Sequence, residues 1–158
     1  MEQWLKKVPQ RHGYYIAGFV DGEGSFNVSL KKREDYRNPW KISASFNVSQ
    51  RDRVILAFIK RWMRSGTLRE RRDGVVYYEV TNVSSLYHNV TPFFTRFPFL
   101  SATKKRNFSI FKEVVEKMYR GEHLTPIGFK NIISLRERLN VGRGRKRKYN
   151  RSDVISEQ

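Results

Sequence analysis

Residues 15–26 read YIAGFVDGEGSF, a stretch that begins like an apolar helix and ends like a strand. Its helical part, residues 14–20, is apolar on all sides, which indicates a helix that is covered on more than one side. Asp21 and Glu23 follow directly, set among glycines. Two acidic residues set among glycines at the end of an apolar helix predict a site in which carboxylates are positioned for chemistry.

Two of these glycines, Gly18 and Gly22, stand four residues apart, with Ala17 beside the first. Small residues at this spacing let two helix backbones approach closely, a device best known from membrane helices. In a protein without a membrane span, the equivalent is a tightly packed helix pair. The alternative is an ordinary core helix that ends in a glycine cap.

The chain of 158 residues has a formal net charge of +17, from 32 Lys and Arg against 15 Asp and Glu. This length suits one compact domain or one subunit of a symmetric assembly. So large a positive excess favours a polyanionic partner, most commonly nucleic acid. No apolar run is long enough to span a bilayer, and the N-terminus lacks a signal-peptide core. We therefore expect no membrane partner and an intracellular location, in the cytoplasm, the nucleoid or an organelle matrix.

Cysteine is absent, which excludes a disulfide framework and a thiolate metal site. The three histidines, His12, His88 and His123, do not show the spacing of zinc ligands. A zinc protein is therefore not expected.

Hydrophobic periodicity predicts an α+β domain in which helices alternate with two antiparallel hairpins. Asn38-Pro39 marks the first hairpin turn, Asp73-Gly74 marks the second, and Asp52 is a plausible helix N-cap. The predicted elements are a helix at 14–20, strands at 25–33 and 40–49, a helix at 52–64, strands at 67–71 and 75–81, and helices at 84–95 (interrupted near Pro92), 102–120 and 125–139.

The chain divides into a lead-in at 1–13, a single domain at 14–140, and a basic tail at 141–158. Residues 142–148 of this tail read GRGRKRK, which suits either a disordered segment or an arm that contacts phosphates. The residues of the 52–64 helix that we expect to face the core are Val54, Ile55, Phe58, Ile59 and Trp62.

Each predicted strand has one apolar and one polar side, so the four polar sides form one open face of the sheet. This open face is rich in side chains that hydrogen-bond the edges of DNA bases. A twisted antiparallel ribbon can lie in the major groove. The expected DNA contacts are Ser25, Asn27, Ser29, Lys31, Arg33, Lys41, Ser43, Ser45, Asn47, Arg69, Arg71, Tyr77 and Glu79.

These features resemble the LAGLIDADG homing endonuclease family. Residues 16–24 (IAGFVDGEG) occupy all nine positions of its signature. The resemblance runs over roughly residues 13–139, because the order helix, hairpin, helix, hairpin, helix fits throughout, and segments 97–111 and 121–139 look like the family's C-terminal half. The signature positions that depart conservatively are Ile16, Phe19, Val20, Gly22 and Glu23.

The resemblance implies the LAGLIDADG fold, αββαββα with C-terminal helices, and a saddle-shaped antiparallel sheet laid in the major groove. It implies a site-specific double-stranded DNA endonuclease of the kind involved in intron homing. One motif implies a homodimer on a long, near-palindromic target. The helices of the two subunits would pack through Tyr15, Ala17, Gly18 and Gly22.

Two other functions stay open. An RNA maturase or a non-cleaving DNA-binding regulator would use the same fold, and the maturase would add RNA as a partner. A basic ribosomal or RNA-packaging protein would explain the charge but not the motif.

The resemblance also implies a metal site. Glu23 stands at the position of the metal ligand, and the backbone carbonyl of Gly22 would be a second ligand. The metal would be Mg²⁺ or another divalent cation such as Mn²⁺, held by few carboxylates together with the phosphates of the substrate. Asp21 is expected to be structural, because its place in the motif suits capping or bonding to nearby backbone.

Two more catalytic residues follow from the resemblance. Gln50, after the second strand, corresponds to a polar group that positions water. Lys104 corresponds to a basic residue of the catalytic site, and Lys105 is the alternative if the alignment slips by one.

Overall fold

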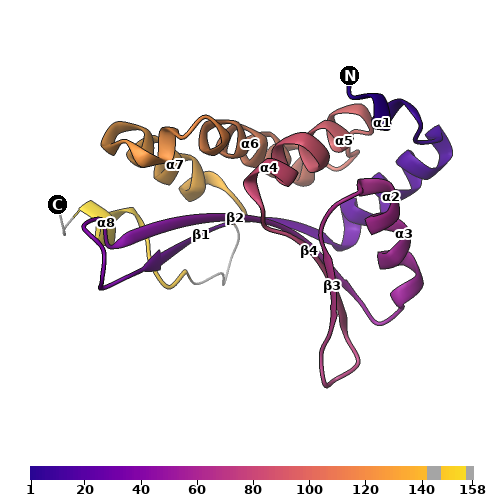
Figure 1. Ribbon diagram of the computed structural model, residues 1–158, viewed down its shortest axis with the longest axis horizontal. Coiled ribbons are helices and arrows are strands. Elements are labelled where there is room, and N and C mark those ends of the chain that lie inside the picture. The colour runs from indigo at the N-terminus through magenta and orange to yellow at the C-terminus, as the bar shows by residue number, and fades with distance from the viewer. Residues whose placement is uncertain (142–146, 156–158) are drawn as a thin grey trace.

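The structure, a computed structural model, describes residues 1–141 and 147–155. A four-stranded antiparallel sheet in the order β1-β2-β4-β3 is covered on one face by helices (Figure 1). The predicted α+β class, the two hairpins and their turns are confirmed. The strands are β1 (Gly24–Lys32), β2 (Trp40–Gln50), β3 (Thr67–Glu70) and β4 (Val76–Val80).

The helices follow the predicted order, and the predicted interruption near Pro92 is a π-helical turn. Pro92 has no N–H to donate to the preceding turn, which accounts for the wider hydrogen-bond spacing just before it. The helical elements are α1 (Gln3–Lys6), α2 (Gln10–Glu23), α3 (Arg53–Met63), α4 (Val83–Ser85), the π-helix η1 (Leu86–Val90), α5 (Thr91–Arg96), α6 (Ala102–Tyr119), the 3₁₀-helix η2 (Glu122–Leu124), α7 (Pro126–Arg138) and α8 (Arg151–Ile155).

An aromatic layer joins the covered face of the sheet to α5 and α6. Phe26 of β1 stacks on Phe46 of β2 with ring centroids 5.2 Å apart. Across the layer, Phe26 meets Phe94 of α5 at 6.0 Å and Phe111 of α6 at 4.9 Å. Burial of such rings contributes stability roughly in proportion to the apolar area removed from water. This layer fixes α6 over the first two strands.

Helix α2 is longer than predicted, because it begins at Gln10 and continues to Glu23. Ile16 and Val20 are fully buried, whereas the side chains of Tyr14 and Tyr15 are more than half exposed. In a single chain, therefore, only one side of this helix is covered. Cover on more than one side, as predicted, would require another molecule packed against the exposed side of α2.

The predicted core side of α3 was partly wrong. Asp52 does cap the helix, because its carboxylate accepts the N–H of Val54 at 2.9 Å. Val54 itself, however, is 76% exposed. Ile55, Phe58 and Trp62 are partly buried against the core, as expected, and the ring of Phe58 also lies 5.1 Å from that of His12 in α2. The fully buried residues of α3 are Leu56, Ile59 and Met63.

The described part of the C-terminal tail, residues 147–155, is folded against the domain. The ring of Tyr149 meets Trp40 of β2 edge to face at 5.0 Å, and Val154 of α8 is buried. Figure 1 shows α8 beside the end of β1 and β2 at which the hairpin turn joins them. Most of the basic run 142–148, for which a disordered tail or an arm was considered, lies outside the described residues.

Candidate active site

Helix α2 passes into β1 without a loop, at Gly24. A Cβ on Gly24 would come within 2.5 Å of the Val20 side chain and 3.0 Å of the Val20 carbonyl oxygen. Only glycine therefore allows the strand to leave the helix so closely. As a result Glu23, the last residue of α2, is held at the junction of helix and sheet with its side chain exposed.

Asp21 ties the end of α2 to the start of α6. Its carboxylate accepts the backbone N–H groups of Leu100 and Ser101, each at 3.0 Å, and the hydroxyl of Ser101. Burial alone would raise the pKa of Asp21, but these hydrogen bonds and the charge of Lys104 hold its pKa below the ordinary value. Asp21 is thus engaged in the fold, which leaves Glu23 as the exposed acid of this stretch.

Lys104 lies in the first turn of α6, where Ser101 is the N-cap. Its ammonium group donates to the backbone carbonyl of Gly24. Burial lowers the pKa of Lys104, and the negative charge of Asp21 opposes this shift. Lys105 is exposed. Of the two lysines considered, Lys104 is therefore the one that the fold brings to the end of the motif.

Gln50 is the last residue of β2, and β1 begins opposite Val48. Gln50 therefore lies at the same end of the sheet as Glu23. Its side-chain oxygen accepts the N–H of Arg51 at 2.9 Å. The fold thus gathers Glu23, Gln50 and Lys104 at one end of the sheet.

The oxygen donors at this end suit a hard divalent cation. The carboxylate of Glu23 stands beside the carbonyl of Gly22, which belongs to the last helical turn, where carbonyls lack helical partners. Residues 1–141 and 147–155 contain no group of three or more His, Cys, Asp or Glu that could hold a metal. Glu23 and Gly22 therefore offer two oxygen ligands for such an ion, and its other ligands would have to come from elsewhere.

The exposed side of α2 is flat at its glycines. A Cβ placed on Gly18 or Gly22 would meet nothing within 4 Å, and Tyr15 on the same side is 59% exposed. Ala17, in contrast, is only 3% exposed and faces the core. This corrects the expected contact between helices. Ala17 is buried within the chain and cannot belong to that contact, whereas Tyr15, Gly18 and Gly22 are exposed and can.

The predicted open face lies on the side of the sheet away from the helices. Strand register pairs Ser25 with Asn47 and Asn27 with Ser45. The hydroxyl of Ser25 donates to the Asn47 side-chain oxygen at 2.6 Å, so the polar groups near Glu23 are already ordered. The other expected residues on this face of β1 and β2 are Ser29, Lys31, Lys41 and Ser43.

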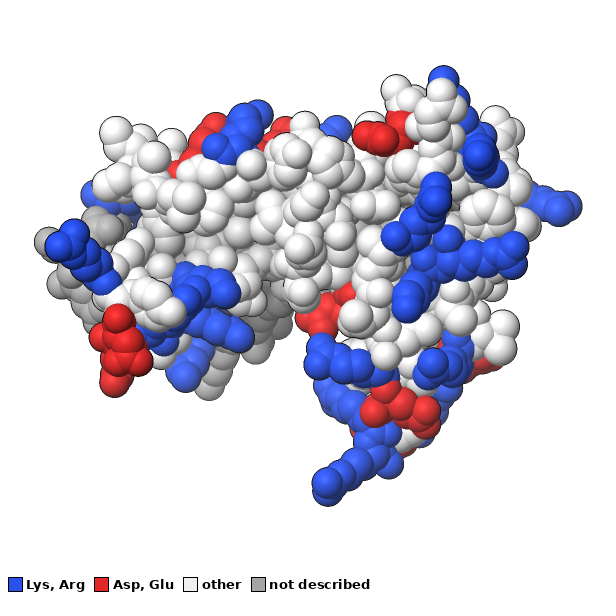
Figure 2. Space-filling view, viewed as in Figure 1, with Lys and Arg blue, Asp and Glu red and all other residues white. Residues whose placement is uncertain are grey.

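The second hairpin continues the open face with paired charges. Arg69 forms an ion pair with Glu79 at 2.8 Å, and the guanidinium of Arg71 lies 4.0 Å from the Tyr77 ring centroid. Arg33 lies just beyond the end of β1, over the ring of Tyr36, so its prediction as a strand residue is corrected. Figure 2 shows Lys and Arg gathered over this hairpin and beside α8, with a hollow between them.

Sequence reasoning missed Ser101 and the segment 147–149. Ser101 stands directly before a predicted helix, which is the signal for an N-cap, but its bond to Asp21 spans 80 residues of sequence. Segment 147–149 comes to lie beside the open face, as described below.

Comparison with known proteins agrees with this geometry. A family profile described as "LAGLIDADG endonuclease" matches residues 16–115. The chain is 31% identical over 132 residues to "Probable intron-encoded endonuclease 2" of Neurospora crassa, covering 81% of this chain and 29% of that protein. It is 30% identical over 108 residues to "Homing endonuclease I-ApeII" of Aeropyrum pernix, covering 67% of this chain and 64% of that protein.

Among solved structures, the chain is similar to the archaeal intron-encoded homing endonuclease I-Vdi141I, which was solved in complex with DNA. The TM-score is 0.82 at 31% identity, over 92% of each chain. The chain spans about a quarter to two thirds of the length of the first curated relatives that it matches. No helix within the described residues is long and apolar enough to cross a membrane.

Proposed function

The chain belongs to the LAGLIDADG endonuclease family, and from this premise we propose that it is a site-specific endonuclease that cuts double-stranded DNA as a homodimer. The observation that carries the proposal is the junction at Gly24, which holds the exposed carboxylate of Glu23 next to Lys104 and Gln50. The same junction places this group at one end of an open, polar and basic sheet face.

A second copy of the chain completes the site. The exposed side of α2 around Gly18 and Gly22 has room for the close approach of an identical helix. Two-fold symmetry would then bring two Glu23 carboxylates together. A symmetric pair of open faces fits a long, near-palindromic target.

The family uses divalent cations, and we assign Mg²⁺, or alternatively Mn²⁺, to this site. The carboxylate of Glu23 and the carbonyl of Gly22 would hold the ion together with phosphate oxygens of the DNA. Such an ion activates water and offsets the negative charge of the phosphodiester that is attacked.

The protein groups around the site have separate roles in this proposal. Gln50 orients the attacking water through its side-chain amide. Lys104 offsets negative charge that develops on the phosphate, because its ammonium is fixed at the Gly24 carbonyl. Asp21 positions Lys104 by fixing the first turn of α6.

The decisive experiment compares the parent with Glu23→Gln on a randomised duplex DNA library in Mg²⁺. We expect the parent to cut a recoverable, near-palindromic site and Glu23→Gln to bind that site without cutting it. Glu113→Gln, an equal loss of charge at an exposed position of α6, should cut like the parent. Cutting by Glu23→Gln at the parent rate would contradict the proposal.

A parent protein that binds duplex DNA but never cuts it would instead support the non-cleaving regulator. A parent that binds only intron RNA would support the maturase. The same preparation thus separates the three functions.

A further inference from the structure

Arg136 fastens the C-terminal segment to the outer edge of the sheet. β1 is an edge strand, and its Val28 carbonyl accepts the Nε–H of Arg136 at 2.9 Å. The same guanidinium donates through Nη1 to the carbonyl of Tyr149 at 3.0 Å. Arg136 is only 5% exposed, so these bonds are shielded from water. One buried side chain therefore bridges β1 and the C-terminal segment.

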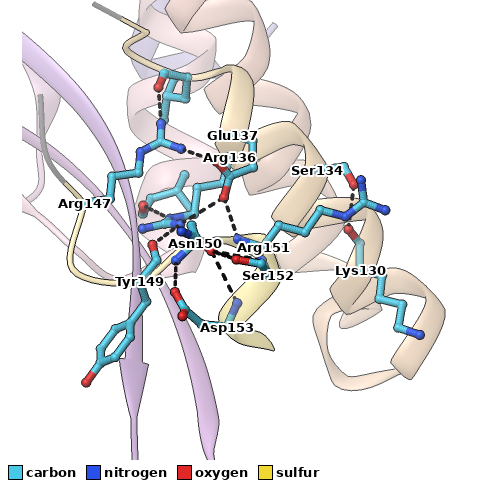
Figure 3. Close-up of polar contacts among 12 residues, drawn as sticks. Lys130, Ser134, Arg136, Glu137, Arg147, Tyr149, Asn150, Arg151, Ser152 and Asp153 are labelled. Atoms are coloured by element: carbon cyan, nitrogen blue, oxygen red, sulfur yellow. Dashed lines mark hydrogen bonds and ion pairs between the residues drawn. The ribbon is translucent and has the colours of Figure 1, made fainter. Parts of the chain in front are cut away.

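Glu137, the next residue, holds the segment at two further points (Figure 3). One carboxylate oxygen pairs with Arg147 at 3.0 Å, and the other accepts the N–H of Arg151 at 3.0 Å. Figure 3 shows these groups turned toward one another from α7 and from the segment. Residues 147, 149 and 151 are thus each attached to the end of α7.

This placement extends the open face sideways past its edge strand. A groove of about 380 Å³ separates the open face from the segment. Its walls come from strands β1 and β2, from the end of α7 and from the segment. The polar residues of the open face that line it are Asn27, Ser29, Ser45 and Asn47, and those of the segment are Arg147, Lys148 and Tyr149.

The charge of the segment identifies its partner. Residues 147–155 carry three cations, Arg147, Lys148 and Arg151, and one acid, Asp153, a net charge of +2. The Glu137 carboxylate is paired with Arg147, and the Arg151 side chain turns toward Ser134 of α7, away from the strands (Figure 3). Lys148 is exposed and lines the groove beside the open face. A cation in this place suits the phosphates that flank the bases of a duplex.

We propose that Lys148 binds the phosphate backbone of the duplex on the open face, outside the part of the DNA that β1 contacts. This inference rests on the proposed function, because it takes the open face to be the DNA-binding surface. The segment would widen the DNA footprint of each subunit without adding base recognition. It would act by charge alone, so its contribution is the same for every DNA sequence.

The test measures binding of Lys148→Glu to a 40-bp duplex of mixed sequence between 50 and 200 mM salt. This variant should bind several-fold more weakly than the parent, and the slope of log K against log salt should shrink by about one for the lost phosphate contact. Lys112→Glu is the matched control. It makes the same charge change on α6, on the other side of the sheet, where Lys112 bonds Thr95.

The outcomes are distinct. If Lys148→Glu binds with the affinity and salt slope of Lys112→Glu, the segment does not contact DNA, although the proposed function would stand. If the parent binds no duplex DNA at all, both proposals fail together. Thermal melting of each variant checks that a loss of binding is not a loss of folding, and Lys148→Gln, which only neutralises the charge, should give about half the effect.

Discussion

Asp21 and Glu23 are two residues apart but have opposite environments. Asp21 is surrounded by donors from Leu100 and Ser101, whereas Glu23 is exposed at the helix end. A carboxylate that accepts several N–H groups is stabilised in its charged form but has few oxygen lone pairs left for a metal. Hydrogen bonding alone therefore gives Asp21 a structural role and leaves the Glu23 carboxylate available as a ligand.

The bonds of Asp21 make a contribution to stability that depends on pH. Its folded-state pKa lies below the ordinary value of 3.8, so the contribution is present above that value and is lost as pH falls through the folded pKa. Asp21→Asn should lower the free energy of unfolding by about 1–3 kcal/mol at pH 7. The difference from the parent should shrink below pH 4. Urea unfolding at pH 7 and pH 3 measures it, and an equal difference at both values would contradict this reading.

The lysine that the fold selects can be tested against its neighbour. Lys104→Gln should reduce the rate of DNA cutting on the order of 100-fold, because a positioned positive charge near the reacting phosphate is lost. Lys105→Gln removes the same charge one residue away, at an exposed position, and should leave the rate within a few-fold of the parent. Single-turnover cleavage at saturating protein separates this effect from weaker DNA binding. The reverse order of effects would show that Lys105 is the catalytic residue.

At the scale of elements, side chains at the C-terminal end of α7 bind the backbone of the neighbouring strand β1. Arg136 and Asn140, at the end of α7, both donate to carbonyls of β1, at Val28 and Phe26. Asn140 has a positive φ of 53°, a conformation that asparagine adopts more readily than most residues. The end of α7 is thus shaped to place two side chains on one strand.

Removal of the buried guanidinium should loosen this arrangement. Arg136→Met leaves the Val28 and Tyr149 carbonyls without this donor, and it removes one ion-pair partner of Glu137. We therefore expect the free energy of unfolding to fall by about 3 kcal/mol. Arg138→Met, an exposed change on the same helix, should cost less than about 0.5 kcal/mol. Guanidinium unfolding compares them. Equal stabilities would mean that the segment is held by Trp40 and Val154 rather than by Arg136.

The elements show how far sequence reasoning reaches. Strands β1 and β2 were predicted almost to the residue, because alternation with period two reports directly which face is buried. The core side of α3 was predicted less well, because the apolar pattern alone does not tell that Leu56 and Met63 are buried while Val54 is exposed. The fold of residues 147–155 was not predicted, because Arg136 and Tyr149 are brought together by tertiary contacts.

The candidate site, like the fold, was predicted only in part. Glu23 and Lys104 came from resemblance to a family, and the structure brings both to the end of α2. The choice between Lys104 and Lys105 needed the phase of α6, which the bond between Ser101 and Asp21 sets across 80 residues. Ala17 was misplaced because small size suggests a helix contact but does not tell which side of the helix faces out.

At the scale of the whole molecule, the proposed homodimer would hold half of the site in each chain, so its activity would depend on assembly. Gly18→Leu should leave the single chain folded, because a side chain there meets open space. The same side chain would hold two copies of α2 apart, so sedimentation should show a monomer that does not cut DNA. Ala57→Leu, at an exposed position of α3, is the control and should stay dimeric and active. A dimeric Gly18→Leu protein would rule out this helix contact.

The two outer strands of the sheet have a consequence for how copies of the chain can meet. Unpaired strand edges invite other strands to add to them, which leads to aggregation. On β1 the carbonyls of Phe26 and Val28 are already occupied by side chains of the α7 end. On the other side β3 is only four residues long and carries Arg69 and Glu70. Both edges thus disfavour the addition of another strand, and in the proposed homodimer the contact between subunits would be left to helix α2.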